Sequence, residues 1–275
     1  MTKNLIYFSQ SAELFEGPIF DFKHQLLYFV SILDGLVYCY NPNTKEILSI
    51  KLDSPSSNVY VVSKKVVLVA SKNGFYEIDF NTLKSTFKFQ IDIAKNARYN
   101  DGIEDSSGRY IIGTMGYPEV INGIGNVYSY HNGASKVIIE NTTISNGLAF
   151  SDDNKTLYFI DTPTKKVAKY NYNIETGNVE FIDYVIEFNG DGSPDGMCID
   201  KNGMLWIAEW GGACVSQWNP STGKKINEIS LPFINVTSCC FDDKANLYIT
   251  TAKNDKVNGY EKGSGLFYVE INQDI

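Results

Sequence analysis

The sequence predicts an all-β fold, a six-bladed β-propeller formed as a single domain by residues 1–275. Short apolar runs, rich in aromatic and β-branched residues, recur along the whole chain. Equivalent positions in successive runs lie 40 to 48 residues apart, a period typical of propeller blades. No long amphipathic helix interrupts this pattern. A ring of small sheets needs no helical layer.

Each apolar run is the predicted second strand of one blade. The six runs are 26–32, 66–72, 110–116, 156–162, 204–210 and 246–252. An alternating segment, usually opened by glycine, follows each run as the predicted third strand: 35–41, 74–80, 125–131, 166–172, 213–219 and 265–271. A further apolar segment precedes each run as the predicted first strand: 17–22, 59–63, 101–105, 147–151, 196–200 and 237–241. Tight polar turns join first and second strands into hairpins.

The chain ends soon after the third strand of the sixth blade. At the other end, residues 4–9 form a predicted apolar strand that is not assigned to any of the six blades. We expect this N-terminal strand to pair as the outer strand of the sixth blade. Such pairing would close the ring and cover an exposed sheet edge.

Composition limits the possible partners. The net charge is −8, and no basic run is present that could neutralise phosphates, so no nucleic-acid partner is expected. The N-terminus lacks the pattern of a secretory signal, and no apolar stretch is long enough to span a membrane. The five cysteines lack metal-finger spacing, and we interpret them as reduced core residues. We therefore expect a cytoplasmic monomer or weak dimer without a membrane partner.

Polar residues stand where the first strands begin. In a propeller these strands line the central channel, so equivalent first residues form a ring around its mouth. Counting back 10 or 11 residues from the aligned second-strand positions gives Glu16, Ser57, Asn100, Asn146, Asp195 and Thr237. Two carboxylates and two amides on one axis are costly to bury unless a cation lies between them. The alternative is that polar residues merely begin strands.

A ring of oxygen ligands favours a hard divalent cation. We expect one such ion, calcium first, with zinc, manganese, magnesium or iron as alternatives. Other catalytic arrangements are poorly supplied, because the chain has two histidines and no G-x-S-x-G motif. His24 falls in a predicted hairpin turn and His131 at the end of a third strand, so a Ser-His-Asp mechanism is not expected.

Several ordered motifs resemble one known family. They are 16–18, 98–102, 108–110, 113–115, 144–148 and 194–200. Together they are similar to the SMP-30/gluconolactonase/luciferin-regenerating-enzyme family, from about Glu13 to the last strand. The resemblance implies a six-bladed propeller, a single divalent cation and hydrolysis of sugar lactones. It matches the metal ligands to Glu16, Asn146 and Asp195. It also matches Asn100 to a residue near metal and substrate, and Arg98 to one that grips substrate oxygens.

One segment departs from the family pattern. Some relatives place a glutamate just after the Gly-Thr-Met segment to bind a sugar hydroxyl, whereas 116–118 intervene here. Glu119 could substitute only if the loop shifts. The loop 116–123 is predicted either as a lid that tunes specificity or as a plain connection.

These observations lead to a mechanistic hypothesis. A water molecule attacks an aldono-1,4- or 1,5-lactone such as gluconolactone at a metal-polarised carbonyl, after giving its proton to Asp195. The cation would keep the pKa of Asp195 low. Arg98, Asn100, Asp101 and Glu119 are the candidate substrate-binding residues, and Asp101 is also an alternative base. Two rivals remain: a non-enzymatic calcium-binding propeller, and a metal-dependent aryl-ester or organophosphate hydrolase.

Overall fold

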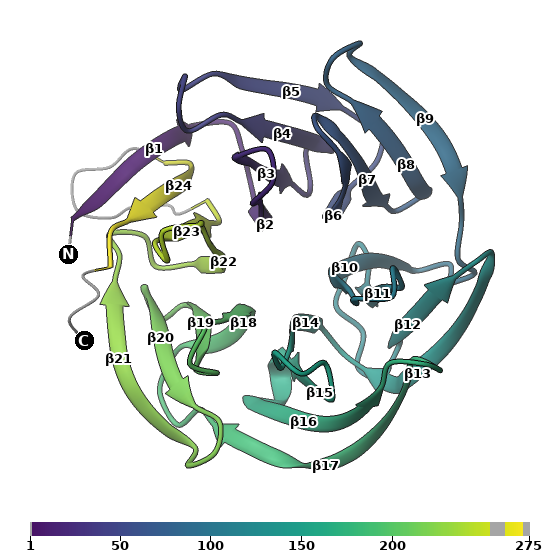
Figure 1. Ribbon diagram of the computed structural model, residues 1–275, viewed down its shortest axis with the longest axis vertical. Helices are drawn as coiled ribbons and strands as arrows, with labels where there is room; N and C mark the ends of the chain where they lie inside the picture. Colours follow the sequence, from purple (N-terminus) through teal and green to yellow (C-terminus); the bar gives the residue numbers. More distant parts are fainter. Residues whose placement is uncertain (1, 254–261, 272–275) are drawn as a thin grey trace.

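The computed structural model describes residues 2–253 and 262–271. Residues 1, 254–261 and 272–275 of the predicted domain lie outside this range. Six four-stranded antiparallel sheets are arranged radially around a central channel, as Figure 1 shows. The predicted six-bladed β-propeller is confirmed.

The strands follow one another from the channel outwards in each blade. The first blade contains β2 (Phe15–Asp21), β3 (Leu26–Ser31), β4 (Leu36–Tyr40) and β5 (Ile47–Lys51). The second contains β6 (Ser56–Ser63), β7 (Val66–Ser71), β8 (Gly74–Asp79) and β9 (Lys84–Phe89). The third contains β10 (Ala97–Glu104), β11 (Tyr110–Gly116), β12 (Gly125–His131) and β13 (Ala134–Thr142).

The other half of the ring has the same order. The fourth blade contains β14 (Ser145–Phe150), β15 (Thr156–Asp161), β16 (Lys166–Asn173) and β17 (Asn178–Glu187). The fifth contains β18 (Ser193–Ile199), β19 (Leu205–Trp210), β20 (Cys214–Asn219) and β21 (Lys224–Ser230). The sixth contains β22 (Val236–Phe241), β23 (Leu247–Thr251), β24 (Ser264–Val269) and β1 (Lys3–Ser9). A single turn of 3-10 helix, η1 (Thr162–Thr164), follows β15. No helix among the described residues has the length and apolar character needed to cross a membrane.

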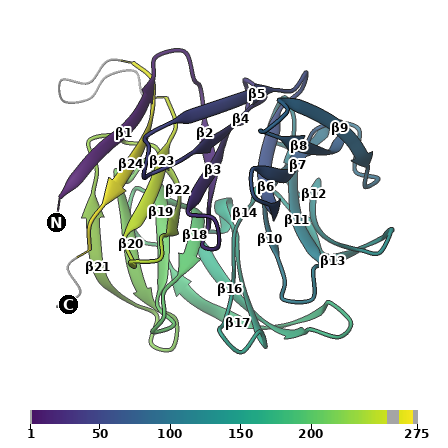
Figure 2. The same ribbon diagram turned by 45° about the horizontal axis from the view of Figure 1, so that its top comes forward.

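The N-terminal strand closes the ring, as predicted. β1 pairs antiparallel with β24 from Lys3↔Val269 to Ser9↔Ser264, and Figure 2 shows the two strands side by side. Tyr7 stacks on Phe15 of the first blade at 5.9 Å between ring centroids, while Phe8 meets Phe233 edge-on at 6.3 Å. The first and last strands along the sequence, β1 and β24, are therefore paired within one blade, and the edge of β24 is covered.

The core consists of apolar layers packed within and between the blades. One of these layers joins the first two blades through Tyr28, Val30, Val59, Val69 and Ile78. Burial falls from the channel outwards: every residue of β14 is buried, whereas five of the six residues of β9 are exposed. The inner strands are thus held rigidly, which suits them to position a site.

Candidate functional site

Each inner strand is interrupted by an irregularity in its pairing near its first residues. The register shifts between Glu16 and Ile19 in β2, between Tyr99 and Gly102 in β10, and between Ser145 and Leu148 in β14. The corresponding shifts in β6, β18 and β22 lie at 56–58, 194–197 and 236–238. A β-bulge frees one or two residues from the ladder and re-aims their side chains. Five of the six predicted ring residues lie within these shifts, and Glu16 is the last paired residue before its own.

Glycines allow the bulged strands to approach one another closely. A Cβ atom on Gly147 would lie 2.8 Å from the carbonyl oxygen of Asp195, and one on Gly196 would lie 2.2 Å from the hydroxyl of Ser238. Neither position could accept a side chain without moving the neighbouring strand. The glycines beside Asn146 and Asp195 therefore narrow the channel where the two polar side chains lie.

Three carboxylates and one guanidinium are buried together at this mouth. Glu16, Asp101, Asp195 and Arg98 each keep 8% or less of their surface exposed. Glu16 lies within electrostatic range of the other two carboxylates and of Arg98. With all four groups ionised, this cluster would carry a net charge of −2. Such an arrangement is unfavourable in a buried site without further positive charge.

The titration behaviour of the cluster follows from that imbalance. Burial, with added repulsion from Asp101, raises the pKa of Asp195 well above its ordinary value. Burial and repulsion from both other carboxylates also raise the pKa of Glu16 well above its ordinary value. Burial raises the pKa of Asp101 to about 7, although the positive charge of Arg98 acts to lower it. Burial also lowers the pKa of Arg98 to about 10. Without a cation, the pKa of Asp195 is raised. The lowered pKa that the sequence predicted included the charge of a bound cation.

Hydrogen bonds join the amide residues of the ring. Arg98 donates to the side-chain oxygen of Asn100 at 2.6 Å, and Asn100 Nδ2 donates to Asn146 Oδ1 at 2.5 Å and to the carbonyl of Ser145 at 2.9 Å. Asn146 Nδ2 in turn donates to Thr162 Oγ1 at 2.7 Å. The structure therefore brings Arg98, Asn100 and Asn146 together.

Thr162 is a member of this network that the sequence did not identify. Its hydroxyl donates to the carbonyl of Pro194 at 2.8 Å, next to Asp195. It lies in η1, after the second strand of the fourth blade, so counting along first strands could not find it. The contact fixes the Asn146 side chain relative to β18.

Glu16 is oriented by its own backbone. Gly17 N–H donates to Glu16 Oε2 at 2.7 Å, and Gly17 has a φ of +53°, a conformation that glycine adopts without strain.

The remaining two ring residues, Ser57 and Thr237, form hydrogen bonds outside the buried cluster. Ser57 donates to the carbonyl of Ala70 at 3.3 Å, and Thr237 donates to the carbonyl of Phe15 at 2.6 Å. Their hydroxyls thus serve the backbone of neighbouring strands.

The loop between β11 and β12 borders the cluster at one of its ends. Tyr117 lies close enough to Arg98 to affect its pKa, although burial has the larger effect. The ammonium of Lys72 lies 5.8 Å from the centre of the Tyr117 ring. Glu119 is exposed, and its backbone carbonyl packs against Gly116. Its role in substrate binding stays a prediction, and Tyr117 is a neighbour of the site that the sequence did not single out.

The two histidines and five cysteines lie in the predicted places. His24 is in the turn after β2, where its ring contacts Asp21 at 2.7 Å, and His131 ends β12. All five cysteines are free. Within residues 2–253 and 262–271, no three His, Cys, Asp or Glu side chains form a group arranged to hold a metal. The predicted ligand set is of another kind, because it combines two carboxylates with the amide of Asn146.

Comparisons with known proteins agree with this description. Residues 14–253 match the family model described as "SMP-30/Gluconolactonase/LRE-like region". The chain is 34% identical to regucalcin of Xenopus laevis over 253 residues, covering 89% of this chain and 85% of that protein. It is 35% identical over 270 residues to a Bacillus subtilis protein named for sugar lactone lactonase activity, YvrE, covering 94% and 92%. The crystal structure of a calcium-binding protein, regucalcin, from Agrobacterium tumefaciens superposes with a TM-score of 0.87 at 24% identity, covering 97% and 92%.

Proposed function

Because the chain belongs to the SMP-30/gluconolactonase/LRE-like family, we propose that it is a metal-dependent hydrolase that opens a small sugar lactone. The substrate class is an aldono-1,4- or 1,5-lactone such as gluconolactone. The likeness to the Bacillus protein named for sugar lactone lactonase activity supports the reaction class. The buried carboxylates beside the bulges, near the starts of the inner strands, support its dependence on a metal ion.

The donor set fits one hard divalent cation. Glu16, Asn146 and Asp195 would hold it through oxygen atoms, the ligands that calcium, magnesium and manganese prefer, and zinc or iron also accept carboxylates. A charge of +2 would offset the net −2 of the ionised cluster. It would also lower the pKa of each carboxyl group, in opposition to the burial that raises it in the chain alone. Calcium is the ion we expect first.

When bound, such a cation polarises a carbonyl as a Lewis acid. The residues of the chain would do the rest. Asp195, ionised and fixed on a bulge of β18, would accept the proton of the attacking water, and Asp101 is the nearby alternative. Arg98 and Asn100, already hydrogen-bonded to each other, would hold the hydroxyl groups or the ring oxygen of the sugar. Burial of these groups excludes bulk water, so each contact is worth more than it would be at the surface.

A second candidate is a calcium-binding propeller without turnover. This candidate is favoured by the likeness to regucalcin of Agrobacterium tumefaciens, a protein described as calcium-binding. It is also favoured by the net negative charge of the buried cluster of Glu16, Asp101, Asp195 and Arg98, which a cation would offset. An assay of acid release with a pH indicator, over a panel of aldonolactones, aryl esters and phosphotriesters, separates the candidates. Release that is confined to lactones and lost on metal removal supports the proposal. Tight calcium binding without acid release from any compound would favour the second candidate.

The role of Asp195 is tested by separating metal binding from chemistry. Asp195→Asn keeps a carbonyl oxygen for the ion but cannot accept a proton. We expect it to retain metal while turnover falls by roughly 10²- to 10⁴-fold, the usual worth of a general base. Glu16→Gln should instead weaken metal affinity and regain much of its turnover in excess metal. Asp183→Asn, an exposed carboxylate on β17, is the matched control and should change neither quantity.

The contrary result is equally clear. If Asp195→Asn reaches near-normal turnover at saturating metal, then Asp195 acts only as a ligand. The proton would then have to be taken by another group, and Asp101→Asn is the next variant to assay.

A further inference from the structure

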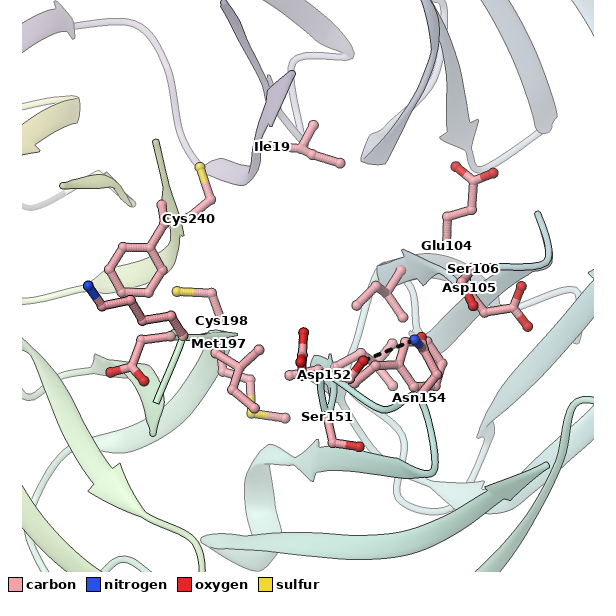
Figure 3. A pocket seen from close by; sticks show the side chains of 18 of the residues that line it. Ile19, Glu104, Asp105, Ser106, Ser151, Asp152, Asn154, Met197, Cys198 and Cys240 are labelled. Carbon is pink, nitrogen blue, oxygen red and sulfur yellow. Dashed lines mark hydrogen bonds between the residues drawn. The ribbon is translucent and has the colours of Figure 1, made fainter. Parts of the chain in front are cut away.

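A cavity opens at the opposite end of the channel from Glu16 and Asp195. It has a volume of about 710 Å³ and lies where the inner strands end. Figure 3 shows the side chains of Ile19, Met197, Cys198 and Cys240 around its opening. Five of the six inner strands contribute to its wall, β6 being the exception. The proposed hydrolase reaction makes no use of this cavity.

The wall of this far cavity is mostly apolar. Its apolar lining includes Ile103, Leu148, Phe150 and Met197, which belong to β10, β14 and β18. Water beside such side chains finds few hydrogen-bond partners, so an apolar ligand can displace it favourably. The volume lies within the range of sites that hold small molecules.

The rim of the far cavity carries unbalanced negative charge. Asp105 is neutralised by Arg109 at 2.9 Å. Within the part of the chain that the structure describes, Asp200 accepts hydrogen bonds from neutral donors only, among them Trp206 Nε1 at 2.9 Å and Gln217 Nε2 at 3.0 Å.

Two further rim carboxylates have no such partner. Neither Glu104 nor Asp152 forms an ion pair with any described residue, and both are exposed at the rim, where Figure 3 shows them. Lys201 is the cationic side chain among the lining residues. Three carboxylates against one ammonium leave the rim at about −2, so it attracts cations.

An exposed aromatic side chain lies at the lip. Phe22 is 60% exposed and meets Phe20 edge-on, with ring centroids 5.5 Å apart. It also lines an adjoining hollow of about 530 Å³, so one face of the cavity continues across it. The face of an exposed aromatic ring can also attract an organic cation.

We infer that the far cavity binds a small organic monocation, a protonated amine carried on an apolar body. The apolar wall would take the body, and the negatively charged rim, to which Glu104 and Asp152 contribute, would attract the ammonium. A sugar lactone, uncharged and covered with hydroxyl groups, suits neither surface. The inference does not depend on the proposed function, because the site shares no residue with the predicted metal ligands.

Binding of three matched probes to the full chain, measured by isothermal titration calorimetry, tests this inference. The probes are 4-phenylbutylammonium, the neutral 4-phenylbutan-1-ol and the anionic 4-phenylbutanoate. We expect saturable binding of the ammonium, tighter than that of the alcohol by roughly threefold to tenfold, since an exposed carboxylate adds only modestly to the binding of a cation. The carboxylate should bind most weakly.

Variants locate the site. Ser106→Trp places a large ring in the opening from an exposed turn position and should weaken all three probes at least tenfold. Phe22→Ala, a change at another exposed position, should also weaken the binding of all three probes. It replaces Ser106→Trp in the experiment if that variant has a much lower melting temperature than the unmodified protein. Glu104→Gln combined with Asp152→Asn should remove the preference for the ammonium while the alcohol still binds. The matched control is Glu140→Gln with Glu180→Gln on the outer strands β13 and β17, which should leave the preference unchanged.

Several outcomes would overturn the inference. They are absence of saturable ammonium binding up to millimolar concentration, equal affinity for ammonium and alcohol, and binding unaffected by both Ser106→Trp and Phe22→Ala. None of these outcomes bears on lactone hydrolysis, which is assayed separately, so the two proposals fail independently.

Discussion

Arg109 offers a quantitative test of how two blades are joined. Its guanidinium donates to Asp105 at 2.9 Å and to the carbonyls of Ile174 and Glu175 at 2.5 and 2.6 Å. Asp105 also accepts the hydroxyl of Tyr172 at 2.6 Å. These contacts connect the third blade to the fourth. Replacing Arg109 by methionine keeps most of the aliphatic stem and removes the charge and the hydrogen bonds of the guanidinium, whereas the backbone N–H of residue 109 still donates to Asp105 Oδ1.

The expected loss can be worked out from burial. The Asp105 side chain is fully buried and that of Arg109 is 10% exposed. Removing one partner of a buried pair costs roughly 3–5 kcal/mol, because it leaves the other charge uncompensated. We therefore expect Arg109→Met to lower the free energy of unfolding by about that amount. Asp105→Asn with Arg109→Met should lose less than the sum of the two single changes, because the two residues interact directly.

Urea unfolding followed by tryptophan fluorescence measures these losses, and pH adds a second check. Burial alone would raise the pKa of Asp105, but the Tyr172 hydroxyl and Arg109 together lower it below its ordinary value. A group whose pKa is lowered in the folded state stabilises the protein above its unfolded pKa of roughly 4, and this stabilisation is lost as the pH falls through the folded value. The deficit of Arg109→Met should therefore be constant between about pH 6 and 8 and shrink in acid. A deficit below about 0.5 kcal/mol at pH 7, the range of ordinary surface changes, would refute the reasoning.

Two further predictions concern the ion and the closing strand. Removing the metal with a chelator should abolish lactone turnover and lower the melting temperature, because the buried carboxylates Glu16, Asp101 and Asp195 are then opposed by Arg98 alone. More than one divalent ion should restore both, and rescue by a single soft metal would contradict the ligand set. Deleting residues 1–9 should lower the melting temperature far more than deleting 1–2, since only the longer deletion removes β1 from the edge of β24. Equal melting temperatures in a circular-dichroism scan would show that β1 does not secure the ring.

The sequence predicted the inner three strands of every blade but not most of the outer ones. The inner strands carry long apolar runs, because both of their faces are covered by neighbouring blades. β9 reads KSTFKF and β17 reads NVEFIDYVIE, with most residues exposed in each. Such strands are fixed by pairing with the strand beside them, and little in their composition separates them from loops. The N-terminal strand was an exception, because the propeller needed a partner for β24.

The candidate site was predicted to a similar extent. Counting from the second strands located Glu16, Asn100, Asn146 and Asp195 because the bulges fall at equivalent places in each blade. The position of Thr162 depends on η1, a short irregular segment outside the repeat, so it had no equivalent to count from. Arg109 belongs to one of the motifs that carry the family resemblance, but it lies outside the candidate site. Its ion pair with Asp105 has a structural role.

The inner strands also explain why the two ends of one channel differ in chemistry. Each strand has polar residues freed by a bulge near its start, and apolar residues follow them, as in β18, where Asp195 precedes Met197 and Cys198. Because all six strands start at the same mouth, oxygen donors accumulate there and apolar side chains accumulate at the other. A narrow cavity of about 220 Å³ lies between, lined by Asp101 at its polar end and by Met197 among its apolar residues. Substitutions at strand starts should therefore affect turnover, and substitutions at strand ends should affect the far cavity, with coupling confined to residues such as Asp101 that line the connection.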